Sequence, residues 1–225
     1  MSAERAITNS VAVVVGGGPI TPPDRSFDAV IVADSGLDVA LAARLEPTLL
    51  VGDLDSISPE GLLWATDHSV PIEHHPTDKD DTDTALALRC AATMTPLHGN
   101  SEVMVLGADV TSRLDHLLGT MVCLGDPVLA SVGRVTAHLG ATHVHVLHPG
   151  QRTTLQLDIG RVFSLLALHG QCDGGVVVSD ARWPLADATL QPGSTLGISN
   201  ESLGRPVVVA VAKGVLTIIV PEVVA

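Results

Sequence analysis

The chain has 225 residues, of which 46% are hydrophobic and 16% charged, which excludes a disordered protein and predicts one large or two small packed domains. The formal net charge of -13 argues against binding to nucleic-acid backbones or anionic membrane surfaces. The three cysteines form no CxxC pair, and the first residues lack the basic start and apolar core of a signal peptide. We therefore expect a cytoplasmic protein with reduced thiols and no nucleic-acid or membrane partner.

The first half of the chain alternates apolar runs with helical patterns. Apolar runs predict strands at 11–15, 29–32, 49–51, 70–73 and 103–106. Helical patterns cover 37–45, a segment that starts at Ser58-Pro59, 82–93 and 114–124. Near-continuous apolar strands separated by helices indicate a parallel sheet covered on both faces. We predict an α/β fold, with a doubly wound, mostly parallel domain at residues 1–138.

The second half has a different pattern, because helical periodicity is lost after about residue 140. Short β-rich runs bounded by Gly and Pro occur at 144–147, 154–157, 162–168, 176–179, 207–211 and 215–220. Ala212-Lys213-Gly214 is typical of a hairpin turn between the last two runs. We predict an antiparallel β-sandwich or barrel domain at residues 139–225. The boundary is soft, since 132–139 also fits a further helix of the first domain.

Polar clusters follow the predicted parallel strands. They lie at 16–18, 34–38, 53–56, 74–83 and 109–116. Ligands of such sheets bind outside the carboxyl ends of the strands, so we expect these clusters to meet at one edge. The glycines at 16–18 form neither GxGxxG nor a Walker-type loop, so a dinucleotide or Walker site is unsupported.

Two acidic clusters indicate a metal site. Asp53 and Asp55 follow a strand, and Asp83 ends a cluster at a helix start. Either cluster alone is also explained by helix capping or by the helix dipole. Together at one sheet edge, crowded carboxylates favour a divalent ion that serves phosphate chemistry. Lys79 and Arg113 are the nearest basic residues, and they fit either phosphate recognition or surface ion pairs.

Trp183 is one of only two tryptophans and lies in Ala181-Arg182-Trp183-Pro184-Leu185, a loop-like context in the β-rich half. A buried core tryptophan is the usual explanation. The alternative is an exposed platform on which a flat or cationic ring stacks.

Six motifs in order resemble the thiamin pyrophosphokinase family. They are Ala33-Asp34-Ser35-Gly36, Val51-Gly52-Asp53-Leu54-Asp55-Ser56, Lys79-Asp80-Asp81-Thr82-Asp83, Arg113-Leu114-Asp115-His116, Trp183-Pro184-Leu185 and Gly197-Ile198-Ser199-Asn200-Glu201. The resemblance covers residues from about 30 to 220. It implies transfer of a pyrophosphoryl group from ATP to the hydroxyl of thiamin, which gives thiamin diphosphate and AMP. It also implies a homodimer in which the β-rich domain helps to bind thiamin across the interface.

The resemblance also implies roles for individual residues. The magnesium ligands implied are Asp53, Asp55 and Asp83. The nucleotide and phosphate contacts implied are Asp34, Ser56, Lys79, Thr82 and Arg113. Arg113 and Asp115 complete the catalytic set, with Asp115 one candidate general base, and thiamin would contact Trp183, Ser199 and Asn200.

The chain departs from the family pattern on the nucleotide side. Residues 35–39 lack the family's second Gly, Asn and Arg, Leu86 or Ala87 replaces a Lys, and Thr111-Ser112 replaces Gly-Gly. These changes keep open a thiamin-binding relative without catalysis. A metal-dependent phosphatase of the Asp-x-Asp type is a second alternative, although Ile57 fits its motif poorly.

Overall fold

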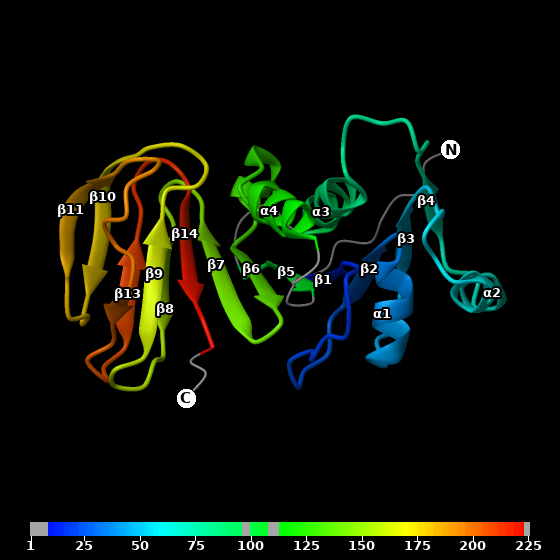
Figure 1. Ribbon diagram of the computed structural model, residues 1–225, viewed down its shortest axis with the longest axis horizontal. Helices are drawn as coiled ribbons and strands as arrows, with labels where there is room; N and C mark the ends of the chain where they lie inside the picture. Colours follow the sequence, from blue (N-terminus) through cyan, green and yellow to red (C-terminus); the bar gives the residue numbers. More distant parts are fainter. Residues whose placement is uncertain (1–8, 96–99, 108–112, 223–225) are drawn as a thin grey trace. The chain divides into compact units, whose positions relative to one another are not determined.

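The structure is a computed structural model that describes residues 9–95, 100–107 and 113–222 (Figure 1). It divides into two compact units, Met1–Gly140 and Ala141–Ala225, and the expected boundary after residue 138 lies beside this division. The first unit is α/β and the second is antiparallel β, so the predicted fold class is confirmed. Among the described residues, no helix has the length and apolarity needed to cross a membrane. Cys90, Cys123 and Cys172 are all free thiols.

The α/β unit is built on a parallel sheet. Its strands are β1 (Ser10–Val14), β2 (Ala29–Ala33), β3 (Leu49–Gly52), β4 (Ile72–His74), β5 (Glu102–Gly107) and β6 (Arg134–Leu139). They pair in the order β6-β5-β1-β2-β3-β4, and every pair is parallel. The chain runs outward from β1 to β4 and returns to β5 on the other side of β1. This reversal is the topological switch point at which such sheets bind ligands.

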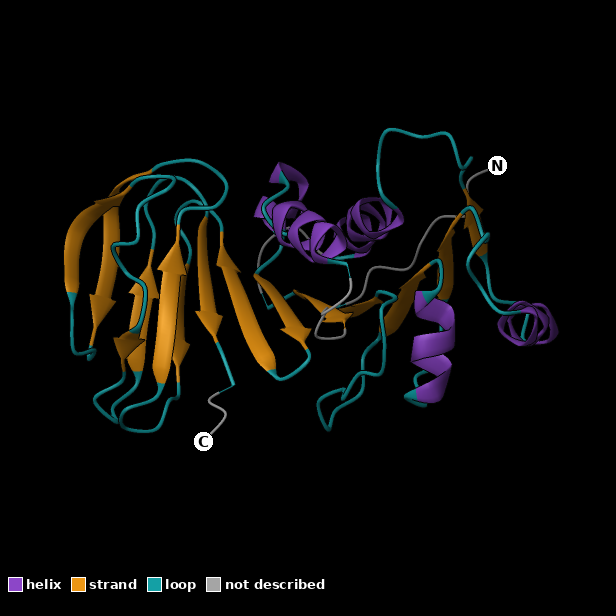
Figure 2. Ribbon diagram, in the orientation of Figure 1, coloured by secondary structure: helices purple, strands orange, loops and turns teal. Residues whose placement is uncertain are grey.

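Helices cover both faces of this sheet. They are α1 (Gly36–Ala42), α2 (Pro59–Asp67), α3 (Asp83–Met94) and α4 (Leu114–Cys123), followed by the 3₁₀ helix η1 (Pro127–Ser131). Figures 1 and 2 show α3 and α4 on one face and α1 on the other. Residues of β1 and β2 are buried on both sides of the sheet, which is why these strands are apolar without alternation.

Two helices begin where the sequence predicts. The Ser58 side chain caps α2 and accepts a hydrogen bond from the Gly61 amide at 2.9 Å. The Thr82 hydroxyl caps α3 and accepts from the Ala85 amide at 3.2 Å. Side-chain caps satisfy amides that have no partner inside the helix. The Thr82 cap also fixes Asp83 as the first residue of α3.

Residues 132–139, for which a helix was one expectation, form strand β6 instead. Val132, Val135 and Leu139 have helical spacing, but Val135, Ala137 and Leu139 also alternate as a strand does, and all four are buried. The β6 strand pairs with β5 along its whole length. Backbone pairing therefore decides between the helical and the strand period, which the sequence fits equally well.

The β unit contains two antiparallel sheets. Its strands are β7 (Thr142–Leu147), β8 (Arg152–Leu155), β9 (Val162–Leu166), β10 (Cys172–Ser179), β11 (Leu185–Leu190), β12 (Asn200–Glu201), β13 (Val207–Ala210) and β14 (Leu216–Val220). They are ordered β12-β9-β14-β7 and β11-β10-β13-β8. Buried residues from both orders form one core cluster, which makes this unit a sandwich. The sequence did not predict β11 and β12.

The predicted hairpin between the last two strands is wrong. Strand β13 pairs with β8 and β10, whereas β14 pairs with β7 and β9. The segment Ala212–Gly214 therefore passes from one sheet to the other. Val207 and Ile218 face the same core from opposite sheets, and alternation alone does not distinguish this crossing from a hairpin.

Candidate active site

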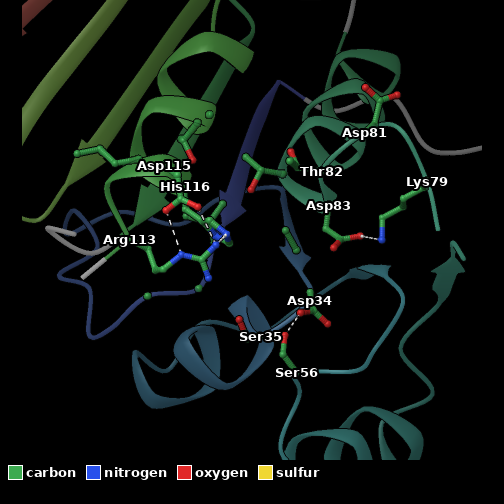
Figure 3. A pocket seen from close by; sticks show the side chains of 18 of the residues that line it. Asp34, Ser35, Ser56, Lys79, Asp81, Thr82, Asp83, Arg113, Asp115 and His116 are labelled. Carbon is green, nitrogen blue, oxygen red and sulfur yellow. Dashed lines mark hydrogen bonds and ion pairs between the residues drawn. The ribbon is translucent and has the colours of Figure 1, made fainter. Parts of the chain in front are cut away.

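A pocket of about 650 Å³ lies at the carboxyl ends of the parallel strands (Figure 3). Its lining brings together segments that the sequence keeps far apart. They include Val15, Gly16 and Gly17 after β1, Asp34 and Ser35 after β2, Ser56 after β3, Lys79, Thr82 and Asp83 around the start of α3, and Arg113, Asp115 and His116 at the start of α4. The prediction that the polar clusters meet at one sheet edge is confirmed for the described residues.

Three carboxylates converge beside this pocket. Asp34, Asp53 and Asp83 each offer one oxygen atom, and these atoms lie within 4.8 Å of one another. Gly52 makes the approach possible, because a Cβ there would lie 3.2 Å from both Asp34 Cβ and Asp83 Oδ1. The φ of Gly52 is +150°, and that of Asp34 is +48°, so the backbone bends sharply where β2 and β3 deliver their acids.

Lys79 lies between two of these carboxylates. Its Nζ is 2.9 Å from Asp53 Oδ2 and 3.2 Å from Asp83 Oδ1, and only 13% of its side chain is exposed. The hydrogen bond from Lys79 lowers the pKa of Asp53. Burial acts to lower the pKa of Lys79, but the hydrogen bonds to Asp53 and Asp83 outweigh burial, and the net shift is upward. The site therefore holds the Asp53 carboxylate and the Lys79 ammonium together as a charged pair.

Asp34 has one oxygen that is available for a ligand. The Ser56 hydroxyl donates a hydrogen bond to Asp34 Oδ2 (Figure 3). Asp34 Oδ1 is buried and has no hydrogen-bond partner among the described residues. A buried carboxylate oxygen without a partner is costly, and a hard divalent cation is the ligand that such oxygens prefer. The donor set of this site fits Mg²⁺.

Asp55, one of the three magnesium ligands that the family resemblance implies, does not belong to this group of carboxylates. Its amide donates to Asp53 Oδ1 at 3.3 Å, while its side chain is exposed. The negative charge of Asp53 is the main cause that raises the pKa of Asp55. Asp34 takes the third place in the group. The signal for it was in the sequence, because Asp34 follows β2 as Asp53 follows the neighbouring strand β3.

Arg113 and Asp115 lie on the opposite side of the pocket from Lys79 and Asp83, as Figure 3 shows. Arg113 donates two hydrogen bonds to Asp115, from Nε at 3.0 Å and from Nη2 at 2.8 Å, and also contacts His116 Nε2. The bond from Arg113 holds the pKa of Asp115 far below its usual range and raises that of Arg113. Paired in this way, Asp115 is a weak base. The altered positions Thr111-Ser112 lie outside the described residues.

The altered segment after β2 has a structural role. Asp38, where the family pattern differs, accepts hydrogen bonds from the amide of Ser58 at 2.9 Å and from its hydroxyl at 2.5 Å. Ser58 is the cap of α2, so Asp38 connects α1 to the start of α2. The sequence showed the departure but not this contact, since the two residues are 20 positions apart.

In the β unit, Trp183 is 51% exposed and is not a core residue. Asn200 is only 2% exposed, and its side chain holds the main chain of Trp183 from both sides. Asn200 Oδ1 accepts from Trp183 N at 3.1 Å, and Asn200 Nδ2 donates to Trp183 O at 2.7 Å. The guanidinium of Arg182 lies 4.8 Å from the centre of the indole ring.

Ser199, the third residue that the family resemblance places at thiamin, precedes this amide. Its φ is +59°, and its amide donates to Ser164 Oγ at 3.1 Å. Asn200 therefore fixes an exposed aromatic surface at Trp183, and Ser199 forms a strained turn next to it.

Fold and site together define a class of protein. It has a doubly wound α/β unit with a pocket that is lined by acidic side chains and by the basic side chains of Lys79 and Arg113. A β-sandwich unit with an exposed tryptophan follows in the chain. Residues 25–131 match the thiamin pyrophosphokinase catalytic domain, and residues 145–216 match the thiamin pyrophosphokinase vitamin B1 binding domain. The chain belongs to the thiamin pyrophosphokinase family.

Individual relatives agree with this assignment. A thiamine pyrophosphokinase of Bacillus subtilis (strain 168) is 24% identical over 212 residues, which cover 92% of this chain and 96% of the relative. A crystal structure of thiamine pyrophosphokinase from Bacillus subtilis has a TM-score of 0.76 at 22% identity, covering 95% of this chain and 99% of its own. The Candida albicans thiamin pyrophosphokinase has a TM-score of 0.74 at 12% identity, covering 96% and 90% respectively. The two structures show the shared fold.

Proposed function

We propose that this protein is a Mg²⁺-dependent thiamin diphosphokinase. It transfers a pyrophosphoryl group from ATP to the hydroxyl of thiamin, and the products are thiamin diphosphate and AMP. The observation that carries the proposal is the meeting of Asp34, Asp53 and Asp83 beside Lys79, in a pocket that Arg113 also lines. Carboxylates for a metal and cations for phosphates are the parts that phosphoryl transfer requires.

In this proposal the carboxylates hold Mg²⁺, with Asp34, Asp53 and Asp83 as ligands and Asp55 as a further candidate. When bound, the ion neutralises charge that develops on phosphate oxygens. Lys79, Arg113 and Thr82 orient the phosphate chain so that the thiamin hydroxyl attacks the β-phosphorus in line with the departing AMP. Catalysis of this type depends on positioning and electrostatics, so no covalent nucleophile is needed. While it pairs with Arg113, Asp115 contributes charge and orientation more than proton transfer.

The β unit would supply the thiamin surface. The thiazolium ring of thiamin is a permanent cation, and an indole face attracts a cation without hydrogen bonds. Trp183 offers that face, Asn200 fixes its position, and Ser199 lies next to it. Following the family resemblance, we propose that the protein is a homodimer and that the active site is completed at the dimer interface.

A product assay tests the reaction. Purified protein with ATP, thiamin and Mg²⁺ is expected to form AMP and thiamin diphosphate in equal amounts, and neither product should form without thiamin or with excess chelator. A phosphatase would instead release inorganic phosphate without thiamin. A thiamin-binding protein without catalysis would bind thiamin and release nothing.

The metal ligands are tested with the matched pair Asp34→Asn and Asp55→Asn. Each change removes one negative charge and keeps the side-chain size. If Asp34 is a ligand and Asp55 is not, Asp34→Asn should weaken Mn²⁺ binding at least about tenfold and Asp55→Asn should weaken it less. Calorimetric titration measures both. The reverse order would restore the ligand set that the family resemblance implies.

The shared site is tested by mixing Asp53→Asn with Trp183→Ala at a thiamin concentration well below the wild-type KM, where both variants turn over slowly. If the pocket of one protomer works with Trp183 of its partner, a mixed dimer contains one intact site, and a random mixture reaches about a quarter of wild-type activity. If each chain contains its own complete site, the mixture shows only the mean activity of the two variants. Light scattering measures the oligomeric state in the same samples.

A further inference from the structure

We propose that Lys79 is a built-in counter-ion, which competes with the free divalent ion for Asp53 and Asp83 and moves to the phosphates when the ion arrives with its nucleotide. This inference deepens the proposed function, because it concerns the same carboxylates. Lys79 Nζ lies 2.9 Å from Asp53 and 3.2 Å from Asp83, and both acids belong to the group that could hold a metal.

The competition follows from charge and space. A divalent ion on Asp53 and Asp83 would bind the same two carboxylates with which the Lys79 ammonium is already paired. Two cations a few ångströms apart repel strongly in a partly buried site, where the effective dielectric is far below that of water. Asp53 and Lys79 are 9% and 13% exposed at the side chain, so solvent weakens this repulsion little. The ion therefore binds fully only when Lys79 leaves.

Asp34 gives the ion a starting point that Lys79 does not occupy. The structure records ion pairs from Lys79 to Asp53 and Asp83. Asp34 Oδ1 and Asp83 Oδ1 are both buried without a hydrogen bond in the described part of the chain, but Asp83 Oδ1 lies 3.2 Å from Lys79 Nζ. Two of the three carboxylates thus pair with an internal cation, while the structure records no ion pair from Lys79 to Asp34. Lys79 stabilises the crowded acids and at the same time lowers their affinity for free metal.

The Lys79 side chain can move from the carboxylates to a bound phosphate. It lies in the loop that precedes α3, outside any helix or strand, and its four-carbon stem is flexible. The pocket that Lys79 lines is also lined by Thr82 and Arg113, the residues proposed to contact the phosphates. A phosphate chain in this pocket offers Lys79 a replacement for the carboxylates. Metal and nucleotide would then bind with positive coupling, because each favours the same position of Lys79.

This mechanism predicts opposite effects for one substitution. Lys79→Met removes the competing charge, so free Mn²⁺ should bind about tenfold tighter, the scale on which a single nearby charge shifts another equilibrium. The same change removes a phosphate contact, so a non-hydrolysable ATP analogue with Mn²⁺ should bind about tenfold weaker. A lysine that only holds the loop in place would weaken both equilibria. A lysine that only binds phosphate would leave free Mn²⁺ binding unchanged.

The experiment is calorimetric titration of Mn²⁺ alone, and of the analogue with saturating Mn²⁺. Lys79→Met and Lys79→Gln are compared with Lys79→Arg, which keeps the charge and should bind free Mn²⁺ as the wild type does. Lys213→Met is the matched control, since it removes the same charge from an exposed turn between β13 and β14. Circular dichroism and thermal melting confirm that each variant is folded.

If both neutral variants bind free Mn²⁺ no more tightly than the wild type, the inference is wrong. These isotherms do not depend on turnover with thiamin. Tighter Mn²⁺ binding in a protein that makes no thiamin diphosphate would support the counter-ion and reject the proposed function. Normal turnover without tighter binding would do the reverse.

Discussion

The two units of this chain build their candidate binding surfaces in different ways. In the α/β unit, charged side chains from three distant segments converge, namely Asp34, Asp53 and Asp83, and Lys79 offsets part of their repulsion. In the β unit, the exposed residue is a neutral indole, and its main chain is fixed by the buried amide of Asn200. The first surface would bind its ligand mainly through charged side chains, and the second through an aromatic ring held in a fixed position.

The difference has a consequence for substitutions. Crowded carboxylates are costly to hold together without their ligand, so removing one should impair ligand binding while stability changes little. The amide of Asn200 is buried and forms hydrogen bonds to the main chain on both sides, so removing it leaves polar groups without partners. We therefore expect substitutions of the carboxylates in the α/β unit to reduce activity with little loss of stability. In the β unit, substitution of Asn200 should reduce both.

The largest effect is expected for Asp53→Asn. The change removes a metal ligand and the partner of Lys79 but keeps the size of the side chain. We expect Mg²⁺-dependent formation of thiamin diphosphate to fall by more than about a hundredfold, because even residues that only support metal ligands cost 10- to 100-fold when replaced. Lost pairing with Lys79 and relieved repulsion from Asp34 oppose each other, so Tm should move by only a few degrees, or about 1 kcal/mol. Steady-state product assays and calorimetry measure the two quantities.

The control for Asp53→Asn is Asp67→Asn, which removes the same charge at the end of α2, away from the pocket lining. It should leave both activity and Tm near the wild-type values. If Asp53→Asn kept near wild-type turnover, the carboxylate group would not be the metal site. If it unfolded the protein, the contrast between the two units would fail.

Much of the α/β unit could be predicted because its strands and its chemistry are both local in sequence. A parallel strand is a short apolar run, and the polar residues that follow it must lie at the ligand edge of the sheet. What could not be predicted depends on backbone geometry or on distant contacts. Asp34 joins the carboxylates only because Gly52 leaves room for it, and Asp38 accepts hydrogen bonds from Ser58, the cap of α2, which is 20 residues away.

The β unit was less predictable because antiparallel strands are joined in more than one way. The alternation at Val207–Ala210 and at Leu216–Val220 identified two strands but not the sheets to which they belong. The role of Asn200 was hidden for a similar reason, since its hydrogen-bond partner is Trp183, 17 positions earlier. The family resemblance identified both residues without indicating that one positions the other.

Asn200→Ala is the next largest test and belongs to the β unit. The change leaves the amide and carbonyl of Trp183 without their partners, so we expect the free energy of unfolding to fall by about 2–3 kcal/mol. The KM for thiamin should rise together with this loss, while the affinity for free Mn²⁺ stays unchanged. Chemical denaturation and calorimetry measure these effects.

The exposed Asn100→Ala is the control for Asn200→Ala, and it should change stability by less than about 0.5 kcal/mol. A stable Asn200→Ala variant with a raised KM would indicate that Asn200 contacts thiamin directly, as the family resemblance implies, and does not act by positioning Trp183.

Trp183→Ala has a smaller expected effect, limited to the thiamin surface. Loss of the indole face should raise the KM for thiamin about tenfold, which corresponds to roughly 1–2 kcal/mol of cation–π attraction. Stability should change little, because the side chain is half exposed. Trp64→Ala is the matched control, since Trp64 lies in α2 and its ring stacks on that of His68, the residue after the helix, with ring centres 4.0 Å apart. Trp64→Ala should lower Tm without changing the KM for thiamin. If Trp183→Ala instead lowered Tm and left the KM for thiamin unchanged, Trp183 would not belong to the thiamin site.

The smallest effect is a difference in pH dependence between the units, carried by His169 in the β unit. Burial lowers the pKa of His169 from its ordinary value of 6.5, and its Nε2 lies 3.2 Å from Thr217 Oγ1 on β14. The unfolded chain binds this proton at a higher pH than the folded chain does, so stability falls as the pH drops from 6.5 toward the lowered folded value. In the α/β unit the pKa of Asp53 is lowered below 3.8, so its contribution is lost only in more acidic solution.

The Tm of the wild type should fall between about pH 7.5 and about pH 5.5. In His169→Gln this fall should be smaller, by a measurable amount of up to about 2 °C. His74→Gln, an exposed change on β4, serves as the control and should leave the slope unchanged. Hydrogen exchange of the β14 amides should report the same difference locally, because Thr217 pairs with β7 and β9 next to this contact. If the slope of Tm against pH were the same in His169→Gln as in the wild type, His169 would not gain a proton on unfolding in this pH range. The two units would then not differ in pH dependence in this range, and only the carboxylates would limit stability in acid.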